Sequence, residues 1–140
     1  TLSSSSAASD VYKRQLFGEK VGIAFQIADD LLDVQSDSTE SGKTPGTDLK
    51  EGVPTLVTLY VMASTDPADK DLVTRLSKPI PESEISKTIL ELRNHKAVTE
   101  VKNYLHKIAD EANQLLNQLP SGPAKDALSN LITALISRSA

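Results

Sequence analysis

One stretch of this chain, Leu16 to Val34, does most to limit the folds available to it. A helix formed there would carry apolar side chains on more than one stripe: Leu16, Phe17, Val21, Ile23, Ala24, Phe25, Ile27, Ala28, Leu31, Leu32 and Val34. A helix that is apolar on most sides is buried on most sides. We therefore expect this segment at the centre of a larger helical assembly rather than at the edge of a small bundle.

The rest of the chain repeats the helical spacing of apolar residues, and no segment shows the alternation of a strand. The pattern predicts helices from Val53 with Pro54 in the first turn, from Asp66-Pro67 to Leu76, from Glu82 to Arg93, from Ala97 to Leu119, and around Ala127 to Leu135. At 140 residues the chain is long enough for one domain with a real core. The sequence thus predicts an all-α fold.

The first fifteen residues show neither a helical nor a strand pattern. They include SSSSAASDVYKRQ, a polar and serine-rich run that resembles a translated sequencing adapter. We interpret residues 1–15 as a non-native or disordered tail, and expect the folded part to begin at Leu16.

Composition excludes several functional classes. A formal net charge of −4 and a pI near 5.1 argue against a nucleic-acid partner held through its phosphates. The absence of cysteine excludes disulfides, thiolate metal sites and thiol nucleophiles, and two histidines are too few for a histidine-rich metal site. No apolar run is long enough to be a transmembrane segment, and no signal peptide is visible. We expect a cytoplasmic protein.

Three carboxylates interrupt the apolar stretch. Asp29 and Asp33 are four residues apart and share one helix face, while Asp30 lies about 100° round the axis from Asp29. Like charges at this spacing cost roughly 0.2–0.5 kcal/mol in water, and burial adds a desolvation penalty. The nearest basic residues along the chain, Lys20 and Lys43, lie more than one turn away. The cluster therefore requires a counter-charge that its neighbours in sequence do not supply.

A divalent cation would supply that counter-charge. Oxygen-only ligands favour Mg²⁺ or Ca²⁺, and Mg²⁺ takes one or two carboxylates together with water and substrate phosphate. The alternative is a solvated acidic face, which for the charge cluster alone is an equally good interpretation. The apolar surroundings of Asp29, Asp30 and Asp33 favour the metal site.

The segment that follows strengthens the metal interpretation. Ser36 to Gly52 is dense in Ser, Thr, Gly and Asp, and is longer than most connections. Lys43 lies among small residues in GKTPGTD, where an ammonium and backbone N–H groups can reach a phosphate. The spacing is not that of a Walker A loop, and a lysine in such a loop is more often merely exposed. It gains weight because the aspartates precede it by ten residues.

FQIADDLLDV followed by SGKTPGTDLKEG resembles the second aspartate-rich motif of the trans-isoprenyl (polyprenyl) diphosphate synthases. The resemblance starts at Phe17-Gly18 and continues more weakly to Arg138, and the loop is most similar to that of actinobacterial members. It implies that residues 16–140 are the C-terminal half of a truncated polyprenyl synthase domain, within the helical bundle of the isoprenoid synthases. The chain would then be a fragment of a prenyltransferase.

The resemblance also implies roles for individual residues. Asp29, Asp30 and Asp33 would bind Mg²⁺ bridged to an allylic prenyl diphosphate, Lys43 would contact that diphosphate, and Phe25 and Gln26 would line the allylic substrate. The reaction implied is ionisation of the allylic diphosphate, attack by the double bond of isopentenyl diphosphate, and loss of a proton. The full-length parent is expected to be a homodimer.

The chain departs from the family pattern in three ways. First, this sequence has no counterpart of the first aspartate-rich motif. Second, it lacks the basic residues that hold isopentenyl diphosphate and an upstream Lys-Thr pair that contacts the allylic substrate. Third, Val53 stands where many members carry a basic residue. We therefore expect the 140-residue chain alone to be inactive. Two alternatives remain: a terpene cyclase or squalene-type synthase, against which the GKTPGTD loop argues, and a non-catalytic helical subunit of a heteromeric synthase, against which the retained aspartates and Lys43 argue.

Overall fold

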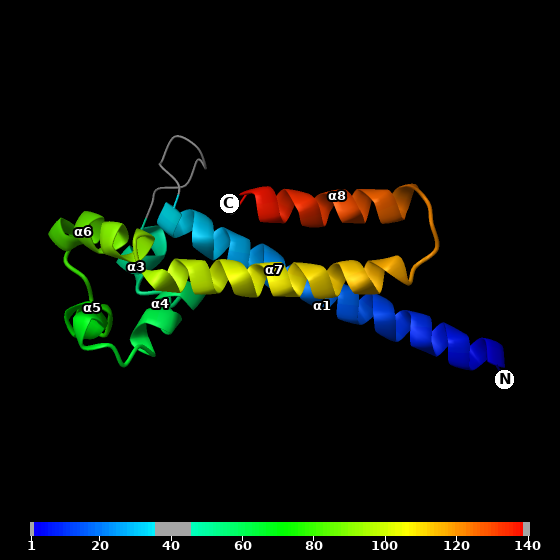
Figure 1. Ribbon diagram of the computed structural model, residues 1–140, viewed down its shortest axis with the longest axis horizontal. Coiled ribbons are helices and arrows are strands. Elements are labelled where there is room, and N and C mark those ends of the chain that lie inside the picture. Colours follow the sequence, from blue (N-terminus) through cyan, green and yellow to red (C-terminus); the bar gives the residue numbers. More distant parts are fainter. Residues whose placement is uncertain (1, 36–45, 139–140) are drawn as a thin grey trace. The chain divides into compact units, whose positions relative to one another are not determined.

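The structure is a computed structural model that describes residues 2–35 and 46–138, and over these ranges the chain forms helices and no strand (Figure 1). The helices in chain order are α1 (Leu2–Gln35), α3 (Thr47–Glu51), α4 (Leu56–Met62), the 3₁₀ helix η1 (Pro67–Asp69), α5 (Lys70–Leu76), α6 (Glu82–Arg93), α7 (Lys96–Asn117) and α8 (Pro123–Arg138). The predicted all-α fold is confirmed. No helix in the described ranges has both the length and the apolar character needed to cross a membrane.

Helix α1 begins earlier than the sequence pattern predicted. Residues 2–15 form its first turns, so a structureless segment there was wrong for the described residues, while their non-native origin stays a prediction. Residues 7–15 are exposed apart from a partly buried Lys13, so tertiary packing does not explain the extension. The stretch contains no Gly or Pro, and extending an existing helix costs far less than nucleating a new one.

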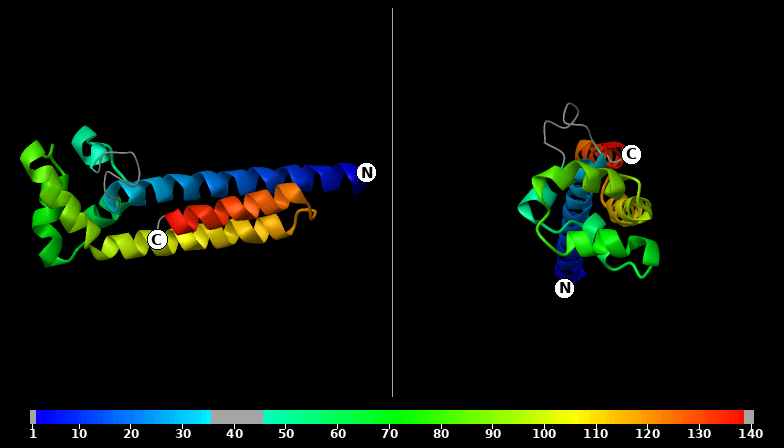
Figure 2. Two further views of the ribbon diagram at one scale, coloured as in Figure 1. Left: turned by 90° about the horizontal axis from the view of Figure 1, so that it is seen from above. Right: turned by 90° about the vertical axis from the view of Figure 1, so that its left-hand side faces the viewer.

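The chain divides into two compact units. The long-helix unit comprises residues 1–28 and 104–140, and the short-helix unit comprises residues 29–103. In the long-helix unit, α7 and α8 run antiparallel beside the first part of α1 (Figure 2). Their core is an apolar cluster of Phe17, Ala109, Ala112, Leu116 and Ile132, against which Val21, Leu115, Leu119, Leu128 and Ile136 pack.

In the short-helix unit, the ends of the helices are fixed by side chains. Thr55 precedes α4 and accepts a hydrogen bond from the backbone N–H of Thr58, whose own hydroxyl oxygen accepts one from the backbone N–H of Thr55. This reciprocal cap places the start of α4 after Pro54, which therefore precedes the helix instead of lying in its first turn. Asp66 caps η1 through the N–H of Ala68, as the sequence predicted.

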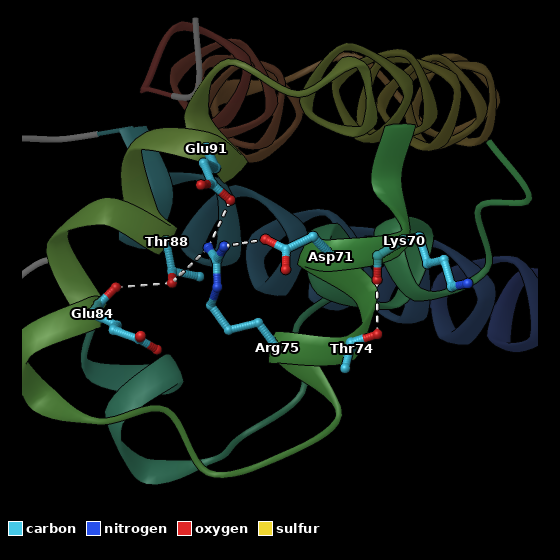
Figure 3. Close-up of polar contacts among 7 residues, drawn as sticks. All are labelled: Lys70, Asp71, Thr74, Arg75, Glu84, Thr88 and Glu91. Carbon is cyan, nitrogen blue, oxygen red and sulfur yellow. Dashed lines mark hydrogen bonds and ion pairs between the residues drawn. The ribbon is translucent and has the colours of Figure 1, made fainter. Parts of the chain in front are cut away.

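Arg75 links α5 to α6. Its guanidinium donates to Glu91 at 2.7 Å and to Asp71 at 2.6 Å, and a longer contact of 3.5 Å reaches the hydroxyl of Thr88 (Figure 3). The Thr88 hydroxyl in turn donates to the carbonyl of Glu84. The hydrogen bond and charge of Glu91 raise the pKa of Arg75 above its ordinary value. Two consecutive helices are thus joined through one nearly buried cation.

A second polar cluster joins α4, η1 and α7. The Ser64 hydroxyl donates to Asp69 at 2.5 Å, and His95 Nε2 lies 2.8 Å from the other oxygen of the same carboxylate. His95 Nδ1 accepts the backbone N–H of Ala97 in the first turn of α7, at 3.0 Å. Because Nδ1 accepts, Nε2 carries the ring proton and donates to Asp69. The hydrogen bonds from Ser64 and His95 lower the pKa of Asp69 below its ordinary value.

Candidate functional site

The three aspartates lie in the last two turns of α1. Asp30 and Asp33 are 8% and 4% exposed, and Asp29 is partly buried. Their neighbours Leu31 and Val34 are also buried. The cluster is therefore not a fully solvated acidic face, which was the main alternative to a metal site.

Asp30 connects α1 to the start of α4. Its Oδ2 accepts the backbone N–H of Leu56, the first residue of α4, at 3.3 Å. The first amides of a helix have no partner within the helix, and a negative charge is favourable at that end. The contact gives one of the three carboxylates a structural role beside any role in binding.

Arg93 brings a positive charge to the same end of α1. Its Nε donates to the backbone carbonyl of Val34 at 3.0 Å, across 59 positions of sequence. This carbonyl is one of the last four of the helix, a position at which the regular helical pattern provides no N–H donor four residues further on. The last residue of α6 is thereby bonded to the backbone at the end of α1.

The donor set fits a hard cation that keeps part of its shell for water or phosphate. The candidates Asp29, Asp30 and Asp33 offer carboxylate oxygens only. In the part of the chain that the structure describes, no three His, Cys, Asp or Glu side chains converge into a group that could hold a metal ion alone. A cage made of protein ligands is thus not formed by these residues, whereas a site using one or two carboxylates is compatible with their placement.

Phe25 and Gln26, predicted to line the substrate, lie on α1 in the turn before the aspartates. Phe25 is 51% exposed, although a large aromatic side chain is more often buried, and Gln26 is also exposed. Lys43, predicted to contact a diphosphate, lies outside the described residues.

Gly46 holds the segment after the glycine-rich loop against α6. Its φ of 80° is in the left-handed region, and a Cβ there would lie 2.4 Å from Ile89 Cδ1 and 3.0 Å from Ile85 Cγ2. Lys50 of α3 pairs with Glu82 of α6 at 2.9 Å and lowers the pKa of that carboxyl. Only glycine fits at position 46 without strain, so the start of α3 is held at a defined position against α6.

A cavity of about 560 Å³ lies beside α3 and is bounded by the start of α4 and the end of α5. Val53, the position where the family resemblance leads one to expect a basic residue, lines it together with Lys50 and Lys78. None of the three aspartates lines this cavity. It is therefore separate from the candidate metal-binding cluster.

Sequence reasoning missed two residues that fix the aspartate helix. Arg93 carried no local signal, because its partner Val34 is distant in sequence. Leu56 follows Thr55, and the Thr-x-x-Thr pattern from Thr55 to Thr58 is a usable cap signal that would have placed the start of α4 correctly.

Comparison with known proteins gives a consistent result. A family model described as polyprenyl synthetase matches residues 1–93. The chain is 39% identical over 122 residues to a nonaprenyl diphosphate synthase of Mycobacterium tuberculosis, covering 86% of this chain and 36% of that protein. It is 32% identical over 125 residues to an octaprenyl diphosphate synthase of Escherichia coli, covering 89% of this chain and 39% of that protein. The chain thus spans well under half the length of these curated relatives.

Solved structures agree. A geranylgeranyl pyrophosphate synthase from Corynebacterium glutamicum, complexed with calcium and isoprenyl diphosphate, superposes with a TM-score of 0.78 at 33% identity, over 87% of this chain and 38% of that one. A heptaprenyl diphosphate synthase from Staphylococcus aureus gives a TM-score of 0.79 at 32% identity, over 93% and 41% of the two chains. The predicted resemblance, including its actinobacterial character, is confirmed.

Proposed function

The chain belongs to the polyprenyl synthetase family, and we propose that it forms part of a prenyltransferase that condenses isopentenyl diphosphate with an allylic prenyl diphosphate. The observation that carries the proposal is the set of three aspartates at the end of α1, two of them buried in apolar surroundings. The relatives named above are polyprenyl diphosphate synthases, and none bears the name of a cyclase. A terpene cyclase or squalene-type synthase is therefore not favoured.

In this proposal Asp29, Asp30 and Asp33 hold Mg²⁺, and Asp29, as the most exposed of the three, makes the most direct contact. When bound, Mg²⁺ would supply positive charge to the departing diphosphate. Lys43 adds an ammonium for the same phosphate oxygens. Asp29, Asp30 and Lys43 are thus the proposed catalytic residues, and none of them needs to act as a base or a nucleophile.

Phe25 and Gln26 act on the hydrocarbon side of the reaction. Their place one turn before the aspartates puts them next to the carbon from which the diphosphate departs. The exposed ring of Phe25 offers apolar surface to the prenyl chain and excludes water, which would otherwise quench an allylic cation. The side-chain carbonyl of Gln26 can turn its negative end toward that cation.

The partners proposed are the two diphosphate substrates and a second protein chain. A homodimer of the full-length parent is the simpler assembly. One relative, 33% identical over 112 residues, is named heptaprenyl diphosphate synthase component 2, of Bacillus subtilis, which makes a two-component enzyme a specific second candidate.

The first test is activity of the 140-residue chain itself with Mg²⁺, isopentenyl diphosphate and an allylic diphosphate. We expect no chain elongation, because counterparts of the first aspartate motif and of the isopentenyl diphosphate site are absent from this sequence. Elongation by this chain alone would contradict that expectation.

The second test introduces Asp29→Ala into the full-length parent. We expect the rate to fall by about 10²-fold or more with the fold intact, since charge stabilisation of the leaving group is lost. The matched control is Asp110→Ala, an exposed carboxylate on α7, which should leave the rate unchanged. Retained activity in the Asp29 variant would rule out its role as a metal ligand.

A further inference from the structure

The first turn of α4 is held by its own cap and by the aspartate helix. The N–H of Thr58 donates to Thr55 Oγ1 at 3.2 Å, and the N–H of Thr55 donates to Thr58 Oγ1 at 2.9 Å. Between these two residues, the N–H of Leu56 donates to Asp30 Oδ2 at 3.3 Å. The first N–H groups of a helix have no acceptor within the helix. Asp30 therefore supplies the acceptor that helix geometry does not give to Leu56.

This contact lies inside one compact unit. Asp30, Thr55 and Thr58 are buried, and together with Leu56 they belong to the short-helix unit. A buried hydrogen bond fixes the direction of its acceptor, because losing it leaves a polar group without water to replace its partner. The orientation of the Asp30 carboxylate thus depends on where the backbone of Leu56 lies, and that backbone is set by the cap on either side of it.

We propose that the Thr55–Thr58 cap is a positioning element for the aspartate cluster: by fixing the N–H of Leu56, it fixes the carboxylate of Asp30 in the orientation that binds the cation. The inference rests on the proposed function, since it concerns the metal that Asp30 would help to hold. It extends that function by giving part of the metal affinity to two threonines and a backbone amide, which bind no metal themselves.

The expected size of the effect follows from the chain of contacts. A carboxylate that is already oriented loses less freedom when a cation binds. Removing a group that hydrogen-bonds a metal ligand directly lowers metal affinity by about 10–100-fold. Thr55 acts one step further away, through Leu56, so its loss should weaken binding only several-fold. Because such coupling is reciprocal, metal binding should also hold the first turn of α4 more firmly.

The experiment titrates Mn²⁺, as a paramagnetic substitute for Mg²⁺, into the isotope-labelled 140-residue chain and follows the broadening of the amide signals of residues 29–34. Thr55→Val removes the hydroxyl that accepts the Thr58 N–H and keeps the shape of the side chain, whereas Thr55→Ser keeps the hydroxyl. The matched control is Thr88→Val, which alters another buried threonine of the same unit, one whose hydroxyl donates to the carbonyl of Glu84. We expect half-broadening at several-fold more Mn²⁺ in Thr55→Val, and wild-type behaviour in Thr55→Ser and Thr88→Val.

Hydrogen exchange in the unmodified chain tests the same coupling and covers the case in which Thr55→Val does not fold. Adding Mg²⁺ should slow the exchange of the Leu56 amide several-fold, because the metal and the cap hold the same carboxylate. The amide of Ala97, which donates to His95 Nδ1 in the same unit, is the control and should not respond. In Asp30→Ala the response of Leu56 should disappear.

The possible outcomes separate this inference from the proposed function. Equal Mn²⁺ dependence in wild type and Thr55→Val would overturn the inference and leave the metal site standing. An equal weakening in Thr88→Val would show a general effect of destabilisation and would overturn it too. So would a Leu56 amide that ignores Mg²⁺, or that slows no more than the Ala97 amide, while residues 29–34 respond to Mn²⁺.

Failure of the metal site itself has a different signature. If residues 29–34 of the wild type showed no broadening, with or without inorganic pyrophosphate, the metal site of the proposed function would be wrong and this inference with it.

Discussion

The two units of the chain differ in the kinds of side chain that are buried inside each of them. In the long-helix unit, a contiguous apolar cluster joins α1, α7 and α8. In the short-helix unit, polar groups are buried as well. Among the described residues, the buried polar side chains all belong to this unit: Asp30, Asp33, Thr55, Thr58 and Thr88. Apolar packing is tolerant of small changes in geometry, whereas a buried hydrogen bond is directional and fails if its partner moves.

The difference indicates where precision is required. The unit that contains the three aspartates is also the one whose helix ends are fixed by hydrogen bonds, through Asp30 to Leu56 and Arg93 to Val34. A metal-binding cluster tolerates little displacement, so rigid polar supports suit it. The long-helix unit supplies the broad apolar core instead.

The largest loss of stability is expected from creating a cavity in the apolar cluster of the long-helix unit. Leu116→Ala removes a side chain that is 2% exposed and should cost about 2–5 kcal/mol of unfolding free energy, measured by urea denaturation. Leu131→Ala on α8, where the side chain is 44% exposed, is the control and should stay within about 0.5 kcal/mol of wild type. Equal losses in the two variants would show that the cluster is not the main source of stability in this unit.

The next largest effect should come from the arginine that links α5 and α6. Arg75→Gln leaves Glu91 without its cation and should cost about 1–3 kcal/mol, again by urea denaturation. Asp71→Asn is the matched change on the other partner, and it should have little effect because Asp71 is 87% exposed. If both variants lost the same amount, the exposed pair and not the link to α6 would be the stabilising contact.

A smaller effect is expected at the start of α7. His95→Ala removes the side-chain acceptor of the Ala97 amide and should cost about 1 kcal/mol, with faster hydrogen exchange at that amide. His95→Asn keeps an acceptor at the cap position and should recover most of the loss. An Ala97 amide that exchanges equally in both variants would contradict the capping role.

The smallest effect concerns the ion pair of the long-helix unit, Lys20 with Glu111 at 2.6 Å. The hydrogen bond with Lys20 lowers the pKa of Glu111 from 4.5, so the contribution is complete above that value and disappears as the pH falls through the lower folded value. The bond with Glu111 raises the pKa of Lys20 from 10.5, so the contribution is also lost at higher pH. The small stability difference between wild type and Glu111→Gln should therefore be present at pH 7 and should shrink as the pH falls below 4.5.

The pair is partly exposed, so its effect at pH 7 should be modest. Lys50→Met, which removes the more exposed pair with Glu82, serves as the comparison and should change the stability less than Glu111→Gln does. A difference between wild type and Glu111→Gln that persisted unchanged at pH 3 would mean that the pair is not its source.

The bounds of most helices could be predicted from the sequence, because the spacing of apolar residues within each segment indicates a helix. The periodicity of Ile85, Ile89 and Leu92 predicted α6 from Glu82 to Arg93, and all three side chains are buried. Contacts between distant segments left no such trace. The short helix α3, within a segment expected to be a loop, is supported by contacts with α6 that its five residues do not encode.

The candidate site divides in the same way. The aspartates were identified from their own spacing, and the need for a counter-charge from the absence of neighbouring bases. That Arg93 bonds to the end of the same helix depends on how α6 packs, which no local pattern contains. The roles of Phe25, Gln26 and Lys43 came from the resemblance to a family, and they stay predictions.

The close packing of Gly46 against α6 has a consequence for how related sequences can diverge. Any other residue at position 46 would have to adopt an unfavourable positive φ, and its Cβ would clash with the end of the Ile89 side chain. A change at position 46 alone therefore cannot keep this packing against α6. Two positions 43 residues apart are thereby expected to covary: wherever the glycine is lost, the residue at position 89 should be smaller than isoleucine. Substitutions at position 89 alone carry no such restriction, so the dependence should appear in one direction only across an alignment of relatives.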